Sequence, residues 1–450
     1  MEFIILILIA VFLYVRGLKA CAMLIFFFFL TQGFNLIPED MTESNFGISK
    51  GHDYAILLLG LILFVDVVLL KKRYLKLDTF LKFLLCFFVF LLCSVIYSKF
   101  VLHISTKEII QSTRIYFLWA VYLVFRDMKK EQLKGLMFIL FNIVVGLSVL
   151  YLFQLVIEEN ILNKQAVTST VIGGIRFQRF YNQPDMLYFF TFTALFVNPY
   201  KGMIKRTTTI ILVSALVLAF HRSLTGFFLF TLGIAYFINL SKGQRWKIAT
   251  AGAVCLLFIV IFFGSKFAAS RTFFDIKIVL TQDVTEVDID IEDLAKSTFT
   301  FRMAHLAERM EFVSESLASK VFGVGLYPED SKAVGKRFDF KVGLIEELTG
   351  KTVQLATGDI VYSLLILYLG YFGTFLFVLL YIVLMISFYK YKNKSKLALA
   401  SFLFIVFSFG ISFFSANLYL PHTFVIALLA YCLVKKEVEE ENIQSEKVLN

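Results

Sequence analysis

The sequence has few charged residues for its length, and this absence excludes most soluble proteins. Charged residues make up 17% of the 450 positions, against about 25% in an average soluble domain. Hydrophobic residues make up 59%, including 54 phenylalanines, and the mean hydropathy is +0.79. No soluble fold buries that much apolar surface, so the composition points to a membrane protein.

The short motifs of many soluble enzymes are also missing. There is no phosphate-binding Gly-rich loop, no His-Glu-x-x-His, no Cys-x-x-Cys and no Gly-x-Ser-x-Gly. These absences argue against nucleotide hydrolysis and metallohydrolase chemistry, and we expect neither a metal nor a cofactor. The cysteines fall within or at the edge of apolar blocks without metal-ligand spacing, so we expect small buried hydrophobic residues at Cys21, Cys86, Cys93, Cys255 and Cys432.

The apolar residues come in blocks of about 17 to 25, a length that lets a helix cross about 30 Å of hydrocarbon. The sequence therefore predicts an all-α, polytopic membrane protein with about 12 or 13 transmembrane helices. The first block lacks a basic region before it and a small-residue cleavage site after it, which favours a retained helix over a signal peptide. The expected spans lie near residues 2–15, 19–32, 54–70, 79–97, 108–125, 133–157, 184–199, 207–220, 222–240, 247–264, 359–388, 396–415 and 418–434.

Basic residues gather in alternate connections, which assigns those connections to the cytoplasm. The net charge of +10 thus reflects orientation and not nucleic-acid binding. The opposite face holds 38–43, 158–183, 221–223 and 264–358. The expected organisation is two transmembrane regions at 1–263 and 359–434, an extracytoplasmic loop at 264–358, and a cytoplasmic tail at 435–450 that we expect to be disordered.

The long extracytoplasmic loop is expected to fold, at least in part, as a helical lid on the membrane surface. Residues 301–321 form an amphipathic pattern, whose apolar face would carry Met303, Leu306, Met310, Val313 and Leu317. An acidic stretch at 283–293 alternates like a strand or an extended loop, and a solvated surface is its simpler explanation.

Arginines near the outer face are the first candidates for chemistry. Arg222 lies between two apolar segments, where a charge is costly and usually functional, although an arginine that snorkels to water at a helix end is the alternative. Arg302 and Arg309 are seven positions apart and share a helix face, where they could clamp a phosphate. Arg176 and Arg179 belong either to a binding element or to a basic patch.

Each remaining candidate has a structural alternative. Arg302 and Arg309 could instead form ion pairs with Glu308 or Glu311 on an exposed face. Asp359 precedes the apolar run 360–388, where a partly desolvated carboxylate could serve as a general base. The alternative, which we favour slightly, is a helix N-cap, a role that aspartate fills well.

The order of these features resembles the O-antigen ligase and polymerase superfamily of bacterial membrane glycosyltransferases, over roughly residues 170–390. The stretch His221-Arg222-Ser223-Leu224-Thr225-Gly226 is similar to the Ser-Arg-Gly type signature that opens a span in that family. Phe301-Arg302 and the turn Gly323-Val324-Gly325 resemble the family's arginine-bearing helix and its Gly-hydrophobic-Gly turn.

Two further stretches extend the resemblance. Residues 180–185 resemble the polar segment that precedes the family's arginine signature. After the long loop, Tyr362, Gly370 and Gly373 fit the family's His-Asn-x-Tyr-Leu pattern and the glycines that follow it. Asp359 stands where the family has its histidine, a departure that puts the identity of the base in doubt.

The resemblance implies a metal-independent glycosyltransferase of the bacterial inner membrane, with its active face outside the cytoplasm. Its donor would be an undecaprenyl-pyrophosphate-linked oligosaccharide, with membrane lipid and a chain-length regulator protein as further partners. Fixed guanidinium groups suit a pyrophosphate leaving group. We therefore expect Arg222, Arg302 and Asp359 to be catalytic, and Arg176, Arg179, Arg309 and Tyr362 to bind substrate.

Three functions remain open at this point, besides a structural scaffold that would leave Arg222 unexplained. The absence of the family's histidine favours a polysaccharide polymerase over a ligase that moves the glycan to a lipid or a protein. A transporter or flippase is the third, but such carriers tend to show internal repeats and charges near the membrane midplane. The sequence shows no convincing repeat and few acids within the spans, with Asp66 as an exception.

Overall fold

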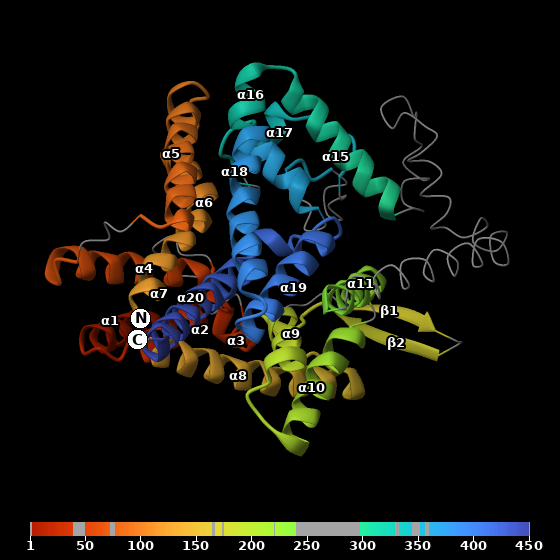
Figure 1. Ribbon diagram of the computed structural model, residues 1–450. Helices are drawn as coiled ribbons and strands as arrows, with labels where there is room; N and C mark the ends of the chain where they lie inside the picture. The colour runs from red at the N-terminus through yellow and green to blue at the C-terminus, as the bar shows by residue number, and fades with distance from the viewer. Residues whose placement is uncertain are drawn as a thin grey trace.

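The computed structural model describes residues 2–38, 50–72, 77–163, 167–172, 175–219, 221–239, 298–328, 331, 333–343, 352–355 and 360–449. These residues are almost entirely helical, so the predicted all-α class is confirmed, with a β-hairpin that the sequence did not predict (Figure 1). The hairpin pairs β1 (Val167–Ile172) with β2 (Ile175–Phe180) in antiparallel register.

The helices follow one another along the chain in this order: α1 (Glu2–Val15), α2 (Lys19–Leu30), α3 (Gln32–Asn35), α4 (Gly51–Phe64), η2 (Val65–Leu69), α5 (Thr79–Phe100), α6 (Thr106–Thr113), η3 (Arg114–Ala120), α7 (Val121–Asp127), α8 (Lys130–Ile157), α9 (Leu187–Val197), α10 (Gly202–Val217), α11 (Arg222–Asn239), α15 (Thr298–Ser314), α16 (Leu317–Phe322), α17 (Val334–Arg337), α18 (Val361–Tyr391), α19 (Lys396–Ile411), η4 (Asn417–Tyr419) and α20 (Pro421–Leu449). The expected span at 108–125 is therefore wrong as a single helix, because α6, η3 and α7 share it. The expected span at 247–264 and the acidic stretch at 283–293 lie outside the described residues.

Four of the described helical segments are long and apolar enough to cross a membrane, namely α4 with η2, α5, α8 and α18. Shorter apolar helices occur at α1, α2, α9, α11 and α19. Large apolar side chains on four helices, Leu8, Val89, Val156 and Phe230, are more than half exposed. Apolar surface of this extent suits lipid better than water, so the chain has the features of a membrane protein.

The described residues of 298–355 form a folded cap, which packs on α18 and on the C-terminal end of α5 (Figure 1). The ring of Phe322 stacks on Phe90 of α5, with centroids 5.9 Å apart. The amide of Leu326 donates to Ser98 Oγ at 3.2 Å, and Ser331 binds the Glu108 carboxylate. The aromatic contact and these hydrogen bonds fix the cap to α5 and α6.

The cap also meets α18 at a break in that helix. Gly370 has φ of +66° and ψ of −175°, outside the helical range. Gly323, with φ of +70°, lies directly against it, and the amide of Val324 donates to the carbonyl oxygen of Leu367 at 2.8 Å. Glycine is needed at both positions, because left-handed φ and the close backbone approach leave no room for a Cβ atom.

The other end of the bundle, which we call the basic end, collects lysines from several connections, namely Lys19, Lys72, Lys130 and Lys394. Asp127 pairs with Lys19 at 2.5 Å and with Lys72 at 2.6 Å. Helix α20 extends to this end, where Glu440 pairs with Lys130 and Asn442 accepts from Lys394 at 2.9 Å. The expectation of a disordered tail is wrong, because these contacts and the helical backbone continue α20 to Leu449.

Candidate functional site

The candidate site lies where α18 begins and α19 ends, and we call this region the site end. Tyr362, in the first turn of α18, donates its hydroxyl to the carbonyl oxygen of Phe409 in α19 at 3.1 Å. The ring of Phe413 lies 4.7 Å from that of Tyr362, centroid to centroid. Tyr362 therefore joins two helices at the site end and also lines it.

Three more helix N-termini reach the same place. The ring of Phe414, just after α19, lies 5.8 Å from Phe227 in the second turn of α11. His422, in the first turn of α20, has Nδ1 3.5 Å from Asp185 Oδ2, just ahead of α9. The N-termini of α9, α11, α18 and α20 thus converge. Because each helix N-terminus carries a partial positive charge and unpaired amides, their convergence favours anion binding.

Helix α15 of the cap buries its basic face, contrary to the sequence expectation. His305 and Arg309 are 1% and 0% exposed, whereas Met310 and Leu317 are 37% and 79% exposed. The predicted apolar face is only partly right: Val313 is buried and Leu306 packs on the core, whereas Met310 and Leu317 are exposed. Helix α15 also ends at Ser314 instead of continuing to residue 321. Positions 302, 305 and 309 follow helical spacing, so they form one stripe directed into the protein.

Arg302 is placed at the seam between the cap and the site end. Its guanidinium carbon lies 5.2 Å from the centroid of the Phe414 ring, a cation–π distance. Through Phe414 and Phe227, the structure brings Arg302 toward the helix that Arg222 begins. This placement agrees with a cation that faces an anionic ligand at the converging helix ends.

His305 is the site residue that the sequence reasoning missed. Its Nδ1 lies 2.7 Å from Ser363 Oγ, in the first turn of α18, and within the described residues its buried Nε2 makes no hydrogen bond. Burial, with a smaller contribution from the charge of Arg309, lowers the pKa of His305 to about 3. The imidazole is thus neutral at physiological pH. The spacing 302, 305, 309 on one helix was the signal that could have identified it.

Arg309 lies inside the cap and not on a substrate surface. Its guanidinium donates to Glu308 at 2.6 Å and to the carbonyl oxygens of Val342 at 2.5 Å and Gln354 at 3.2 Å, and it stacks 4.3 Å from the Phe340 ring. Burial lowers the pKa of Arg309 to about 10, against the opposing effect of Glu308, so it stays charged. The ion pair with Glu308 exists, but in the interior and not on an exposed face.

The remaining sequence candidates are only partly placed. Arg222 is the first residue of α11, and Arg176 and Arg179 lie on β2, opposite Val171 and Thr168; the side chains of all three lie outside the described structure. Asp359 also lies outside the described residues, and the N-cap position of α18 belongs to Ile360.

The polar stretch at 180–185 folds against α8. Asn182 is 1% exposed and shares hydrogen bonds with Gln154 of α8 at 2.8 and 3.2 Å. The amide of Asp185 donates to Asn35 Oδ1 at 3.0 Å. These buried bonds fix the position from which α9 begins and from which Asp185 faces His422.

Comparison with known proteins does not add to this geometry. No protein-family model matches the chain, and no curated protein is significantly similar to it. Any function assigned to the site therefore depends on the motifs in the sequence and on the placement of the side chains.

Proposed function

We propose that the chain is a polysaccharide polymerase, a metal-independent glycosyltransferase that moves a growing glycan from an undecaprenyl-pyrophosphate carrier to a sugar hydroxyl of a lipid-linked repeat unit. The observation that carries the proposal is the position of Arg302 over Phe414, where four helix N-termini converge beneath a cap. Cleavage of a sugar pyrophosphate leaves concentrated negative charge, which fixed cations and helix N-termini stabilise.

The proposal includes a topology. About 12 or 13 segments cross a bacterial inner membrane, with the basic end in the cytoplasm and the cap and the site end outside it. This orientation agrees with the gathering of Lys19, Lys72, Lys130 and Lys394 at one end. It places the chemistry on the face where lipid-linked glycans would be assembled, and a chain-length regulator protein would dock on that same face.

The proton of the acceptor hydroxyl needs a base at the site end. Asp359 remains the proposal from the sequence. His305, whose Nδ1 is held by Ser363, is a second candidate only if the negative charge of a bound pyrophosphate raises its pKa toward neutrality, because an imidazole with a pKa of about 3 is a weak base. Because His305 is 1% exposed, it can act only if the substrate reaches the seam beneath α15.

A groove between α5 and α6 supports the use of a polyprenyl carrier. The groove has a volume of about 300 Å³, and its walls include Leu91, Val95, Ile109 and Phe117, with Lys99 at its border. An apolar channel with a cation at one edge is suited to an isoprenoid chain that ends in phosphate. We propose that the carrier lipid rests there.

The decisive experiment replaces Arg302 with Ala in cells that depend on this protein, followed by analysis of lipid-linked glycans. Loss of a preorganised charge at a reacting phosphate lowers the rate by about 10²–10³-fold, so single repeat units should accumulate. Arg206→Ala, which changes an exposed arginine on α10, is the matched control and should leave polymer length unchanged. Normal polymer from Arg302→Ala at normal protein level would contradict the proposal.

The lipid-linked products of a deletion strain separate the alternatives. Single repeat units on the outer face indicate a polymerase. Carrier-linked polymer that is never transferred onward indicates a ligase, and repeat units retained on the cytoplasmic face indicate a flippase.

A further inference from the structure

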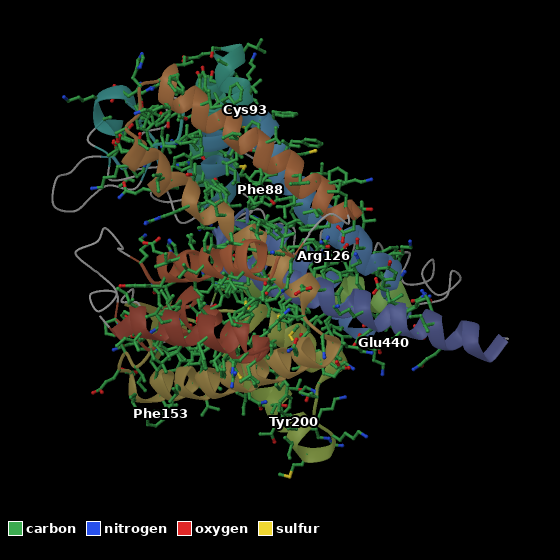
Figure 2. The ribbon with its side chains drawn as sticks, turned by 90° about the vertical axis from the view of Figure 1, so that its left-hand side faces the viewer. Phe88, Cys93, Arg126, Phe153, Tyr200 and Glu440 are labelled. Carbon is green, nitrogen blue, oxygen red and sulfur yellow. The ribbon has the colours of Figure 1, made fainter. Side chains whose placement is uncertain are left out.

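A second cavity lies at the basic end, far along α20 from His422. It has a volume of about 440 Å³ and lies between the start of α5, helix α7 and the middle of α20. Figure 2 shows Arg126 beside α20, with Glu440 farther along that helix. Neither the proposed reaction nor the motifs in the sequence involve this cavity.

One side of the cavity is a fixed polar cluster. The Asp78 carboxylate accepts hydrogen bonds from the Tyr122 hydroxyl, from Lys435 Nζ at 2.9 Å and from the amide of Leu81 at 2.9 Å. The last bond caps α5, so Asp78 is held in place by three separate segments. Lys435 is consequently matched by Asp78 and contributes little net charge to the cavity.

The rest of the lining is basic. Besides the Asp78–Lys435 pair, the charged groups are Arg126, Lys436 and Glu439, so the lining has a net charge of +1 from three cations and two carboxylates. A guanidinium and an ammonium line the same cavity, and the Arg126 guanidinium carbon lies 5.9 Å from the centroid of the Tyr122 ring. Such a pair suits phosphate oxygens, because a guanidinium binds in a bidentate manner and an ammonium as a point charge. The volume falls within the range of about 300–1,000 Å³ typical of small-ligand sites.

We propose that this cavity binds a phosphate-bearing anion through Arg126 and Lys436, with the Asp78–Tyr122–Lys435 cluster as its rigid floor. The phosphate could belong to an anionic lipid headgroup or to a soluble anion, since both present the same oxygens. This site is separate from the site end, and its ligand binds whether or not the chain transfers sugars.

The test measures thermal unfolding of the full-length protein in a neutral detergent at constant ionic strength, with inorganic pyrophosphate or phosphatidylglycerol as the probe and phosphatidylcholine as the neutral comparison. Binding to the folded state alone should raise the midpoint by about 2 °C or more. The double variant Arg126→Gln/Lys436→Gln should lose this rise. The control Lys201→Gln/Lys205→Gln, which removes two exposed charges of α10 and its preceding turn, should keep it.

The outcomes distinguish the two possible sources of the phosphate, a lipid headgroup and a soluble anion. A rise with phosphatidylglycerol alone assigns a lipid headgroup, and a rise with pyrophosphate assigns a soluble anion. If the double variant does not fold, Lys436→Gln alone should weaken the apparent affinity about tenfold, as expected for one charged hydrogen bond. The proposal is overturned if neither probe raises the unfolding midpoint of the unaltered protein. It is also overturned if the double variant, or Lys436→Gln where the double variant does not fold, shows the same rise as the unaltered protein.

Discussion

His305 Nδ1 and Ser363 Oγ lie 2.7 Å apart, so that a buried imidazole joins the cap to the first turn of α18. Because burial lowers the pKa of His305 to about 3, from about 6.5 in an unfolded chain, the unfolded state binds the proton more tightly. The stability of the cap is therefore complete above pH 6.5 and decreases as the pH falls from 6.5 toward 3. At pH 5.5 the loss is about 1.4 kcal/mol.

Hydrogen exchange of the α15 amides at pH 7.5 and 5.5, corrected for intrinsic rates, measures this loss. His305→Gln should flatten the dependence, whereas His103→Gln, at an exposed position before α6, should not. An unchanged slope in His305→Gln would show that other groups control the pH response.

Gly323→Ala should detach the cap from α18. An added Cβ would lie 2.3 Å from the carbonyl oxygen of Leu367, and the backbone φ is +70°. Overpacking and left-handed strain together cost about 2–4 kcal/mol, which limited proteolysis of the cap would detect. Gly335→Ala, where no atom lies within 4 Å of the new Cβ, should leave the cleavage rate unchanged. If both variants are cleaved at similar rates, the close packing of Gly323 against α18 does not hold the cap in place.

Arg309→Ala should unfold part of the cap, because it leaves Glu308 and the carbonyl oxygens of Val342 and Gln354 without their donor. Removal of one partner from a buried ion pair costs about 3–5 kcal/mol. Arg302→Ala should instead reduce glycan transfer with little change in the unfolding midpoint. If the Arg309→Ala protein is stable but inactive, Arg309 binds substrate, as expected from the sequence, and does not mainly stabilise the cap.

Lys72→Ala should destabilise the basic end. Asp66 is fully buried, pairs with Lys72 at 2.7 Å and accepts from the Tyr14 hydroxyl at 2.7 Å, so loss of the lysine leaves a buried charge with one fewer partner. The expected cost is about 3–5 kcal/mol in the free energy of unfolding, measured by chemical denaturation. The double variant Lys72→Ala/Asp66→Asn should recover most of the lost stability. If it recovers none, the effect of Lys72→Ala comes from lost packing and not from the unpaired charge.

Val95→Trp should fill the groove between α5 and α6 and reduce the amount of polyprenyl phosphate retained by the purified protein in native mass spectrometry. Lys99→Gln should weaken binding of the phosphate by at most about tenfold, because the lysine is exposed and its charge is screened by water. Val89→Trp is the matched control on the same helix, at a position 62% exposed. If Val95→Trp, Lys99→Gln and Val89→Trp all retain the same amount of polyprenyl phosphate, the carrier does not bind in this groove.

Long helices were predictable because continuous apolar runs report them directly, as for α8, expected at 133–157 and found at Lys130–Ile157. The hairpin was missed although its signal is local, because Gly173-Gly174 between two runs rich in β-branched and aromatic residues is typical of a two-residue hairpin turn. The predicted burial of the cysteines was wrong for most of those described: Cys21, Cys86 and Cys93 are exposed, and only Cys432 is buried. A membrane protein presents apolar side chains outward as readily as inward, so hydrophobicity does not report burial.

The candidate site was also only partly predictable from the sequence. The sequence directed attention to Arg302 and Tyr362, which the structure places at the site end. It could not reveal that Arg309 would find its acceptors at residues 342 and 354, because backbone carbonyls leave no sequence signature. The spacing of His305 from Arg302 and Arg309 placed it on their helix face, but its contact with Ser363, 58 positions away, leaves no signal in the sequence.

The hydrogen bond from Val324 to Leu367 changes what kind of motion the cap can make. In an unbroken helix the Leu367 carbonyl would bond the amide four residues on, but beside the break at Gly370 the cap supplies a donor. Lipid offers no replacement donor, and an unpaired carbonyl there costs several kcal/mol. The cap is therefore attached to α18 at this bond, and we predict that a motion that moves Arg302 and His305 away from α18 would pivot about it.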